Sequence, residues 1–505
     1  MNTSSYHRYT KLLRFGLLAL GILFVVVYVV VALLRIGYPF ELEWIEGSGV
    51  DHVQRILDGT HLYVRPSIEF TPFLYTPLYF YVSAAVAKLI GIGFVPLRLV
   101  SFAASLGSLA IIHNMVKRET GSLYAAWLAG GTFAATFRIG GAWFDIARPD
   151  MLFVFFALLA IYTIRFYDVW WAYVLAGIFI SLSFLTKQTA LIIAVPIALY
   201  CVIINWRRAV LFIGTTAIII GGSTWLLDRI HNGWYRFYVF EVPSEHYILK
   251  ARYIFFWIND LLHPLPVVCV VAIMYLLLRI FGLARREGIF YLLMAMGMIG
   301  AAWSGRLHSG GYLNTLLPAY AFISILFGVA FYHVVGYFQG QPPGGQDEAS
   351  ALSVFLLYFV CTVQMAGLLY NPARQIPTRA DREAGWQLVN MMKGIDGEVY
   401  LPAHGFLPTY AGKKPYAHVT AVHDLLRGKD MELKAMMIEE LKEAIHQKRF
   451  KAIFIDKDEF IVELSKDYRL VGRVFSDYQA FWPVTGLEIR PEFLFVPKED
   501  ATTQE

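Results

Sequence analysis

The chain has 505 residues, of which 57% are hydrophobic and 16% charged, and its mean hydropathy is +0.53. One soluble core cannot hide so much apolar surface, so the composition excludes a soluble enzyme and indicates a membrane protein. The net charge is only +5 and the Lys and Arg residues are scattered in pairs, which argues against nucleic acid as a partner.

Apolar runs long enough to cross a membrane recur through the first 370 residues. Crossing about 30 Å of hydrocarbon takes roughly 20 apolar residues. The first run is too long for the core of a signal peptide and lacks a small-residue cleavage site, so it predicts a membrane anchor. The runs predict a multi-pass α-helical protein with about eleven transmembrane helices, at 15–36, 97–116, 121–138, 150–166, 170–185, 189–206, 209–227, 261–281, 288–303, 313–336 and 353–370.

The segment Thr76–Gly93 decides the orientation of the chain. It starts with a proline, contains Lys88 and has too few apolar residues for a span, so we interpret it as an interfacial helix. The basic residues of the turns then face the cytoplasm, in agreement with the positive-inside rule. We therefore expect a protein of the cytoplasmic membrane with a cytoplasmic N-terminus. Its outer segments would be 37–96, 139–149, 228–260 and 304–312.

The tail after residue 370 has a different pattern. Helical periodicity over Asp381–Met392 and Met431–Gln447 alternates with the strand-like runs EVYLPA, KAIFID and FLFVP. Mixed helices and strands predict a small α/β unit. We therefore divide the chain into a transmembrane part, 1–370, with a long external loop at 37–96, and an extracytoplasmic α/β domain, 371–505.

Polar and ionisable residues gather in the outer segments, at the edge of the membrane. Such groups are costly at membrane depth unless they are paired or line a wet cavity, so each group is a candidate for a site. Carboxylates could accept a proton from a hydroxyl, while Lys and Arg could bind a phosphate. The candidates for catalysis are Glu43 and Glu46, and those for substrate binding are Asp145, Arg148, Asp150, Lys187, Gln188, Arg306, His308, Tyr312 and Asn314.

Several of these candidates also have a structural interpretation. Glu46 starts an amphipathic stretch and would interact favourably with a helix N-terminus. Asp145 and Arg148 are three residues apart and could neutralise each other on one helix face. Lys187 lies between two apolar runs and could extend to the lipid headgroups. The sequence leaves both interpretations open.

Of the two candidate bases, the sequence favours Glu46. Glu43 and Glu46 lie about one helical turn apart and could share a face. Gly47 would let an acceptor approach the backbone closely beside Glu46. We therefore expect Glu46 to be the base, with Glu43 as its rival.

The order of features resembles the glycosyltransferase C superfamily, in particular the family 39 relatives of the protein O-mannosyltransferases and the lipid A aminoarabinose transferases. One span precedes a long external loop with an acidic motif. The motif G-x-x-L-Y (Gly59, Leu62, Tyr63), the proline-aromatic segment YTPLYFY and a second external loop with aspartate follow. The resemblance implies a membrane enzyme with a bundle of helices and an outward-facing site.

The resemblance also implies roles for individual acids. Glu46 would be the general base for the acceptor, and Asp145 or Asp150 would bind the acceptor or a divalent metal ion. Relatives usually have two adjacent acids in the first loop, whereas here Ile45 precedes Glu46. This departure keeps Glu43 open as the base and leaves a metal cofactor undecided.

The residues and the resemblance together predict an integral membrane glycosyltransferase. The outer segments contain neither a P-loop nor a D-x-D pair, and a nucleotide donor is scarce outside the cell, so we expect a donor sugar on a polyprenyl phosphate. The enzyme would transfer this sugar, with inversion, to a hydroxyl of a lipid, glycan or protein acceptor. Glu46 would take the acceptor proton, while Lys187 and Arg306 hold the phosphate.

Two other functions compete with this prediction. A transporter or flippase of lipid-linked sugar is the alternative, but it would need charges near the middle of the bilayer, whereas these lie at the outer rim. A non-catalytic scaffold that recruits partners through 371–505 would leave the external acids without a purpose.

Overall fold

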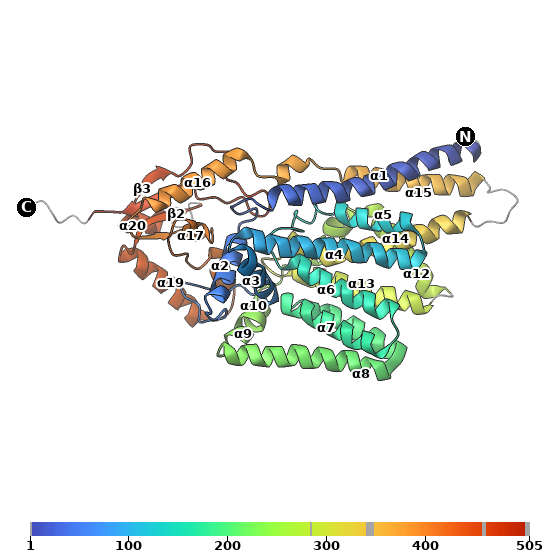
Figure 1. Cartoon of the computed structure of the whole chain (residues 1–505), viewed down its shortest axis with the longest axis horizontal. Coiled ribbons are helices and arrows are strands. Elements are labelled where there is room, and N and C mark those ends of the chain that lie inside the picture. The colour runs from blue at the N-terminus through green and yellow to red at the C-terminus, as the bar shows by residue number, and fades with distance from the viewer. Residues whose placement is uncertain (1–2, 283–284, 340–347, 457–460, 500–505) are drawn as a thin grey trace, which may run out of the picture.

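The computed structural model describes residues 3–282, 285–339, 348–456 and 461–499, and it is mostly helical. A bundle of long helices forms one end of the molecule, and a smaller unit with a four-stranded sheet forms the other (Figure 1). The N-terminus lies at the far end of the bundle, whereas the C-terminus lies beyond the sheet. The chain therefore has the multi-pass helical architecture with a small C-terminal sheet that the sequence predicts.

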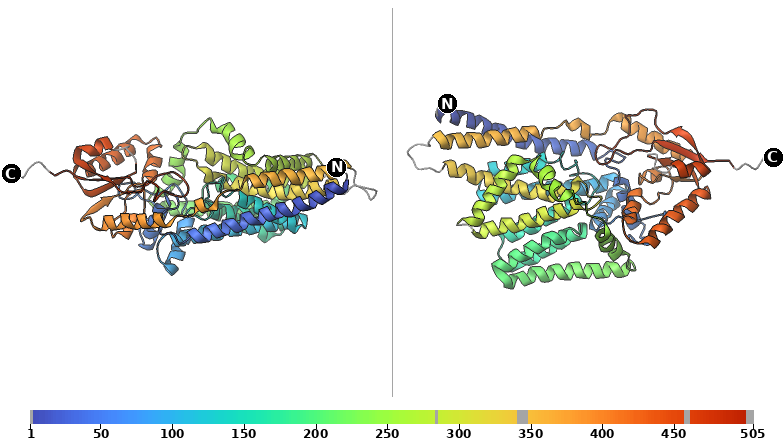
Figure 2. Two further views of the ribbon diagram at one scale, coloured as in Figure 1. Left: turned by 90° about the horizontal axis from the view of Figure 1, so that it is seen from above. Right: turned by 180° about the vertical axis from the view of Figure 1, so that it is seen from behind.

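Apolar helices build the bundle. The first helix, α1, packs against α5 and α15, while α4 joins α5 to α6, and α6, α7 and α8 follow one another toward α13 (Figures 1 and 2). Many outward side chains are apolar, as a lipid environment requires. The helices are α1 (Thr3–Arg35), α4 (Phe94–Thr120), α5 (Leu123–Ala135), α6 (Asp150–Phe166), α7 (Trp170–Thr186), α8 (Ala190–Ile230), α12 (Pro266–Phe281), α13 (Arg285–Leu307), α14 (Leu317–Gln339) and α15 (Glu348–Gly367).

The number of helices is roughly consistent with the predicted spans. Among the described residues, six helices are long and apolar enough to cross a membrane, and the bent pair that ends in α12 would make a seventh. The 41 residues of α8 would extend about 60 Å as one rod, twice the thickness of the hydrocarbon layer. The helix breaks at Asn205, where φ is −156° and ψ is 91°, one residue before the end of the first of the two spans expected there, 189–206 and 209–227.

The segments predicted to share an outer face meet at one end of the bundle. Arg35 at the end of α1 pairs with Asp145 of the second loop, and Ile248 forms an isolated β-bridge with His308. Which side of the membrane this end faces stays a prediction. The short helices here are α2 (Glu46–Leu57), α3 (Leu78–Ile90), α9 (Trp234–Arg236), η1 (Phe237–Glu241), α10 (Val242–Glu245), α11 (Arg252–Phe255), η2 (Phe256–Leu262) and η3 (Leu313–Leu316).

The C-terminal unit combines a mixed sheet with amphipathic helices. Its strand order is β1-β2-β4-β3, in which β1 and β2 are parallel and the other pairs antiparallel. A capping box between Thr378 and Asp381 starts α16. The elements are η4 (Pro372–Gln375), α16 (Arg379–Lys393), β1 (Glu398–Tyr400), α17 (Leu407–Tyr410), α18 (Val419–Leu426), α19 (Met431–His446), β2 (Phe450–Ile455), α20 (Ile461–Asp467), β3 (Tyr468–Arg473) and β4 (Phe493–Pro497).

The predicted helices and strands of this unit are confirmed, but β3 was missed. It is an edge strand, and most of its residues after Tyr468 are exposed. Its sequence therefore lacks the apolar alternation that marks a half-buried strand. The division of the chain at residue 370 stays a prediction.

The C-terminal unit lies directly on the loop that follows α1. A Cβ atom added to Gly47 would lie 2.0 Å from the carbonyl oxygen of Gly405, and one added to Gly405 would lie 2.2 Å from the amide nitrogen of Ser48. Trp44 donates a hydrogen bond from Nε1 to Thr420 Oγ1 at 3.2 Å. The two parts touch backbone to backbone, which only glycine allows at this distance.

This contact predicts that Gly405→Ala destabilises the protein. The added methyl group must push two backbones apart, and overpacking of this kind costs about 1–3 kcal/mol. We expect a lower unfolding temperature for the purified protein in detergent. The matched control is Gly394→Ala in the same unit, where the new Cβ would meet its nearest neighbour at an ordinary 3.6 Å. Equal unfolding temperatures of the two variants would show that the contact is not tight.

Candidate functional site

A cavity of about 710 Å³ lies between the bundle and the C-terminal unit. This volume is in the range of small-molecule sites. Its lining includes aromatic, cationic and hydroxyl-bearing side chains from the first loop, the bundle and α18. Among them are Trp44, Tyr75, Trp143, Arg148, Lys187, Gln188, His308, Tyr312, Asn314, Thr420, His423, Asp424 and Arg427.

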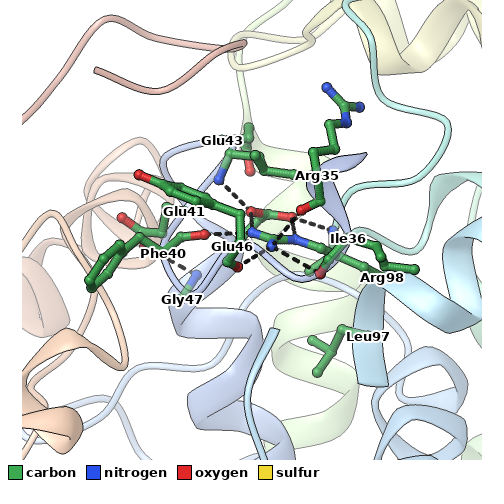
Figure 3. Close-up of polar contacts among 12 residues, drawn as sticks. Arg35, Ile36, Phe40, Glu41, Glu43, Glu46, Gly47, Leu97 and Arg98 are labelled. Carbon is green, nitrogen blue, oxygen red and sulfur yellow. Dashed lines mark hydrogen bonds and ion pairs between the residues drawn. The ribbon is translucent and has the colours of Figure 1, made fainter. Parts of the chain in front are cut away.

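Glu46, at the first turn of α2, is completely enclosed and bonded (Figure 3). Arg98 of α4 donates to Oε1 at 3.1 Å and to Oε2 at 2.6 Å. The amides of Leu42 and Ala147 each donate to the same carboxylate at 2.6 Å. Glu46 does not line the cavity. Its carboxylate is thus committed to holding the loops together.

Glu41 is also occupied, by the C-terminal unit. His404 Nδ1 lies 2.6 Å from Glu41 Oε2, and His404 Nε2 lies 2.8 Å from Asp456 Oδ2. Burial alone would lower the pKa of His404, but Asp456 and Glu41 raise it to about 10, so the ring is a cation. The amide of Gly47 donates to the other oxygen of Glu41 at 3.1 Å. Glu41 therefore bridges the first loop and the C-terminal unit.

Glu43 differs from both neighbours. It is fully buried, its Oε2 accepts only the amide of Ile45 at 3.3 Å, and its Oε1 has no hydrogen-bond partner among the described residues. Burial raises the pKa of Glu43 to about 8, although the nearby Arg148 lowers it. The carboxyl also interacts electrostatically with Tyr75 and Tyr312 of the cavity lining. Glu43 is a buried carboxyl with an oxygen that has no partner among the described residues; like Glu46 it does not itself line the cavity, but its neighbours Trp44 and Ile45 do.

A second charged cluster borders the cavity at the start of α6. Lys187 Nζ lies 2.6 Å from Asp150 Oδ1, and Asn314 Nδ2 donates to the same oxygen at 2.8 Å. Arg148 donates to the Tyr75 hydroxyl at 2.7 Å, and its Nε lies 4.0 Å from Asp150 Oδ2. The cluster has two cations and one carboxylate, so it has a net positive charge.

Of the other residues predicted for the site, some form ion pairs away from the cavity and some line the cavity. Asp145 is buried and pairs with Arg35 through both oxygens, at 2.6 and 2.7 Å. Arg306 pairs with Asp260 at 2.9 Å and does not line the cavity. Gln188 lines the cavity but donates to the carbonyl of Leu74 at 2.8 Å. The structure also places His308 and Tyr312 in the lining.

Tyr312 belongs to an aromatic group at the cavity wall. Its ring centroid lies 5.1 Å from Trp44 and 5.6 Å from Trp143, with the second pair stacked. Arg148 lies over the Trp143 ring at 5.0 Å. This wall offers flat apolar surface next to a cation.

The described residues do not form a metal-binding site. They contain no group of three or more His, Cys, Asp or Glu side chains placed to hold one. Asp145 and Asp150, the acids considered for a metal, are each paired with a cation. We therefore derive no step through a metal.

Two features of the site went unpredicted. Arg98 lies inside an expected span, and the sequence contains no signal for its partner Glu46, 52 residues earlier. The cavity-facing residues of α18 and its C-cap, Thr420, His423, Asp424 and Arg427, have the spacing i, i+3, i+4 and i+7 of one helix face. That periodicity could have been found in the tail, but nothing marked it as belonging to the site.

The comparisons with known proteins concern the family and the fold of the chain. Residues 74–227 match the family of dolichyl-phosphate-mannose-protein mannosyltransferases. Within the chain, this match spans the cluster of Arg148, Asp150 and Lys187. No curated protein matches the chain in sequence.

Solved structures match over nearly the whole chain. ArnT from Cupriavidus metallidurans bound to undecaprenyl phosphate has 13% identity and a TM-score of 0.58, and its apo state has 14% and 0.60; both matches cover 94% of this chain and 97% of ArnT. The archaeal oligosaccharyltransferase AglB from Archaeoglobus fulgidus, in complex with an inhibitory peptide and a dolichol-phosphate, has 12% identity and a TM-score of 0.52, covering 87% of this chain and 69% of AglB. The chain therefore has the glycosyltransferase C fold, and the resemblance seen in the sequence is confirmed.

The site predicts that Arg98→Met is strongly destabilising. The substitution leaves the buried Glu46 without its cation, a change that costs about 3–5 kcal/mol. We expect a large fall in unfolding temperature in detergent. Adding Glu46→Gln to this variant should restore part of the loss, because the uncompensated charge is then removed.

The control for this prediction is Arg379→Met, which removes an exposed ion pair with Glu383 in the C-terminal unit. Exposed pairs contribute at most about 1 kcal/mol, so this variant should unfold near the parent temperature. If Arg98→Met unfolds no earlier than Arg379→Met, the buried pair does not hold the loops.

Proposed function

We propose that the protein is a membrane glycosyltransferase that uses a sugar on a polyprenyl phosphate. The observation that carries this proposal is the cavity, which has two cations of a net positive cluster in its lining. Glu43, a buried carboxyl whose Oε1 has no partner among the described residues, precedes the lining residue Trp44 in the chain. Transfer to a hydroxyl needs both a base and a cation for the leaving phosphate. The fold shared with ArnT and AglB supports the same class.

Lys187 and Arg148 are our candidates for the donor phosphate. Both line the cavity, and each can donate charged hydrogen bonds to a phosphate oxygen. Leu191, Ile192 and Phe240 line the cavity as well, and they offer an apolar path for the polyprenyl chain. The ArnT and AglB structures contain undecaprenyl phosphate and dolichol-phosphate, which supports a lipid phosphate as the leaving group.

Glu43, rather than Glu46, is the base that we propose. Glu46 accepts hydrogen bonds from Arg98 and from two backbone amides, whereas Glu43 keeps an oxygen without a partner among the described residues. A raised pKa also makes a carboxylate a stronger base once it is ionised. The ionised Glu43 would accept the hydroxyl proton of the acceptor.

The reaction then follows as a direct displacement. As Glu43 takes the proton, the acceptor oxygen attacks the anomeric carbon of the donor sugar from the face opposite the phosphate. The bond from this carbon to the phosphate oxygen breaks, and its electron pair leaves on the lipid phosphate. Lys187 and Arg148 stabilise the released charge. The product has inverted configuration.

The acceptor would enter past the C-terminal unit. Thr420, Asp424 and Arg427 present hydroxyl, carboxylate and guanidinium groups to the cavity, which suits a hydroxyl-rich acceptor on a lipid, a glycan or a protein. We place this end of the molecule on the outer side of the cytoplasmic membrane, because the basic turns cluster at the other end.

Glu43→Gln should lower turnover by roughly 10²- to 10⁴-fold, the usual contribution of a general base. The amide keeps the size of the side chain but cannot accept the proton. Turnover would be followed as the release of polyprenyl phosphate from a lipid-linked sugar that the parent enzyme consumes. The control is Asp58→Asn, an exposed acid after α2 that should leave turnover unchanged. Parent-like turnover of Glu43→Gln would exclude Glu43 as the base.

The same residue predicts a pH dependence. Only the ionised carboxylate is a base, and burial raises its pKa to about 8, so turnover should rise as pH increases through about 8 and fall below it. In Glu43→Gln this rise should be absent from the residual rate. A parent profile that is flat between about pH 6.5 and 9, the range that brackets this pKa, would contradict the assignment.

Arg148→Gln and Lys187→Gln should each weaken the binding of undecaprenyl phosphate by about 1.5–3 kcal/mol, the loss expected for a charged hydrogen bond. Binding would be measured by titrating the lipid into the purified protein in detergent. Arg236→Gln removes an exposed cation from the outer segment 228–260 and should bind like the parent. Unchanged affinity in both cavity variants would remove these cations from the donor site.

A further inference from the structure

Two adjoining cavities lie at the end of the bundle opposite the candidate site. The larger, of about 400 Å³, is lined by α5, α14 and α15 and includes Tyr124, His333 and Tyr337. The smaller, of about 170 Å³, lies between α1 and α15 and includes His7 and Lys11. Arg14 and Tyr358 line both cavities, so the two form one polar hollow between helices.

The hollow is basic. His7, Lys11 and Arg14 have the spacing i, i+4 and i+7, which places them on one face of α1. Neither cavity has an Asp or Glu among its described lining residues. Lys11 and Arg14 form no ion pair with any residue that the structure describes. The positive charge is therefore available to an anion.

Aromatic rings hold Arg14 in place. Its guanidinium lies 5.2 Å from the centroid of the Tyr124 ring, and the Tyr124 hydroxyl donates to the Arg14 carbonyl at 3.0 Å. The hydroxyl of Tyr358 lies in the same lining as a further hydrogen-bond donor. A cation oriented by stacking, together with the Tyr358 hydroxyl, is suited to phosphate oxygens.

The surroundings of the hollow are apolar and exposed. On α1, Leu12 and Phe15 are each 62% exposed, and on α15 Leu356 and Phe359 are each 46% exposed. These helix faces would contact the acyl chains of the membrane. An anion that enters the hollow from the membrane between these helices is therefore the headgroup of a lipid. Basic pockets between transmembrane helices at the cytoplasmic side bind anionic headgroups.

We propose that the hollow formed by His7, Lys11, Arg14 and the surrounding tyrosines binds the headgroup phosphate of an anionic phospholipid. The lipid would seal α1 to α14 and α15 at the end where the basic turns gather. This binding does not depend on the proposed glycosyltransferase activity, because α1 begins at the end of the bundle far from the C-terminal unit (Figure 1) and His7, Lys11 and Arg14 lie in its first half.

The test is native mass spectrometry of the purified full chain with phosphatidylglycerol, and with phosphatidylcholine for comparison. The parent should retain phosphatidylglycerol in preference. The double variant Lys11→Gln/Arg14→Gln should weaken its binding on the order of 30-fold, from two cations near the membrane surface. The matched control is Arg8→Gln, an exposed cation of α1 that lines neither cavity and should change binding little.

The outcomes distinguish a phospholipid site from a site for free phosphate and from general charge attraction. Equal retention of phosphatidylglycerol by the double variant and by Arg8→Gln would overturn the proposal. Full displacement of the lipid by millimolar inorganic phosphate would also overturn it, because it would indicate a site for free phosphate. If the double variant does not fold, Lys11→Gln alone decides, with an expected loss of about fivefold. No loss in a folded Lys11→Gln protein would reject the site.

Discussion

The buried ion pair between Glu46 and Arg98 is the interaction on which the end of the bundle next to the C-terminal unit depends. Both side chains are inaccessible to solvent, and the guanidinium also donates to the carbonyls of Tyr38 and Phe40 at 2.6 Å. Two charges removed from water are tolerated only when nearly every donor and acceptor is used. Here one arginine fixes the exit of α1, the start of α2 and the backbone of the second loop.

The pair also accounts for the position of the neighbouring acids. With Glu46 bound to Arg98 and Glu41 bound to His404, the turn between them holds Glu43 without a cation in direct contact among the described residues. A carboxylate without a cation costs free energy when it is buried. Burial therefore favours the neutral form of Glu43 and raises its pKa. Two stable ion pairs thus hold one carboxyl between them in an environment that disfavours its charged form.

Hydropathy was enough to predict the bundle, because the bilayer demands apolar runs of a fixed length. The same pattern could not predict the partners of polar residues. Gly47 was expected to let an acceptor approach the backbone closely, whereas the backbone that packs against it is that of Gly405, 358 residues later. Arg306 was selected as a cation for phosphate, yet Asp260 on η2 binds it. Such pairings depend on tertiary contacts that one sequence does not reveal.

Sequence periodicity predicted local secondary structure better than it predicted tertiary contacts. The strands of the C-terminal unit that pack against its core were found, whereas the exposed edge strand β3 was not. Lys187 and Asn314 were selected as polar residues at the edge of the membrane, and both line the cavity. Their shared partner Asp150 could be guessed only as a neighbour at the same membrane edge.

The position of α18 has a consequence for biosynthesis. The cavity wall at Thr420 to Arg427 lies more than 50 residues beyond the end of α15 at Gly367, so it leaves the ribosome after every helix of the bundle. A nascent chain whose helices are all inserted still lacks one side of the cavity. Synthesis itself therefore delays completion of the cavity until most of the chain has been made, so partly made copies in the membrane lack a closed cavity.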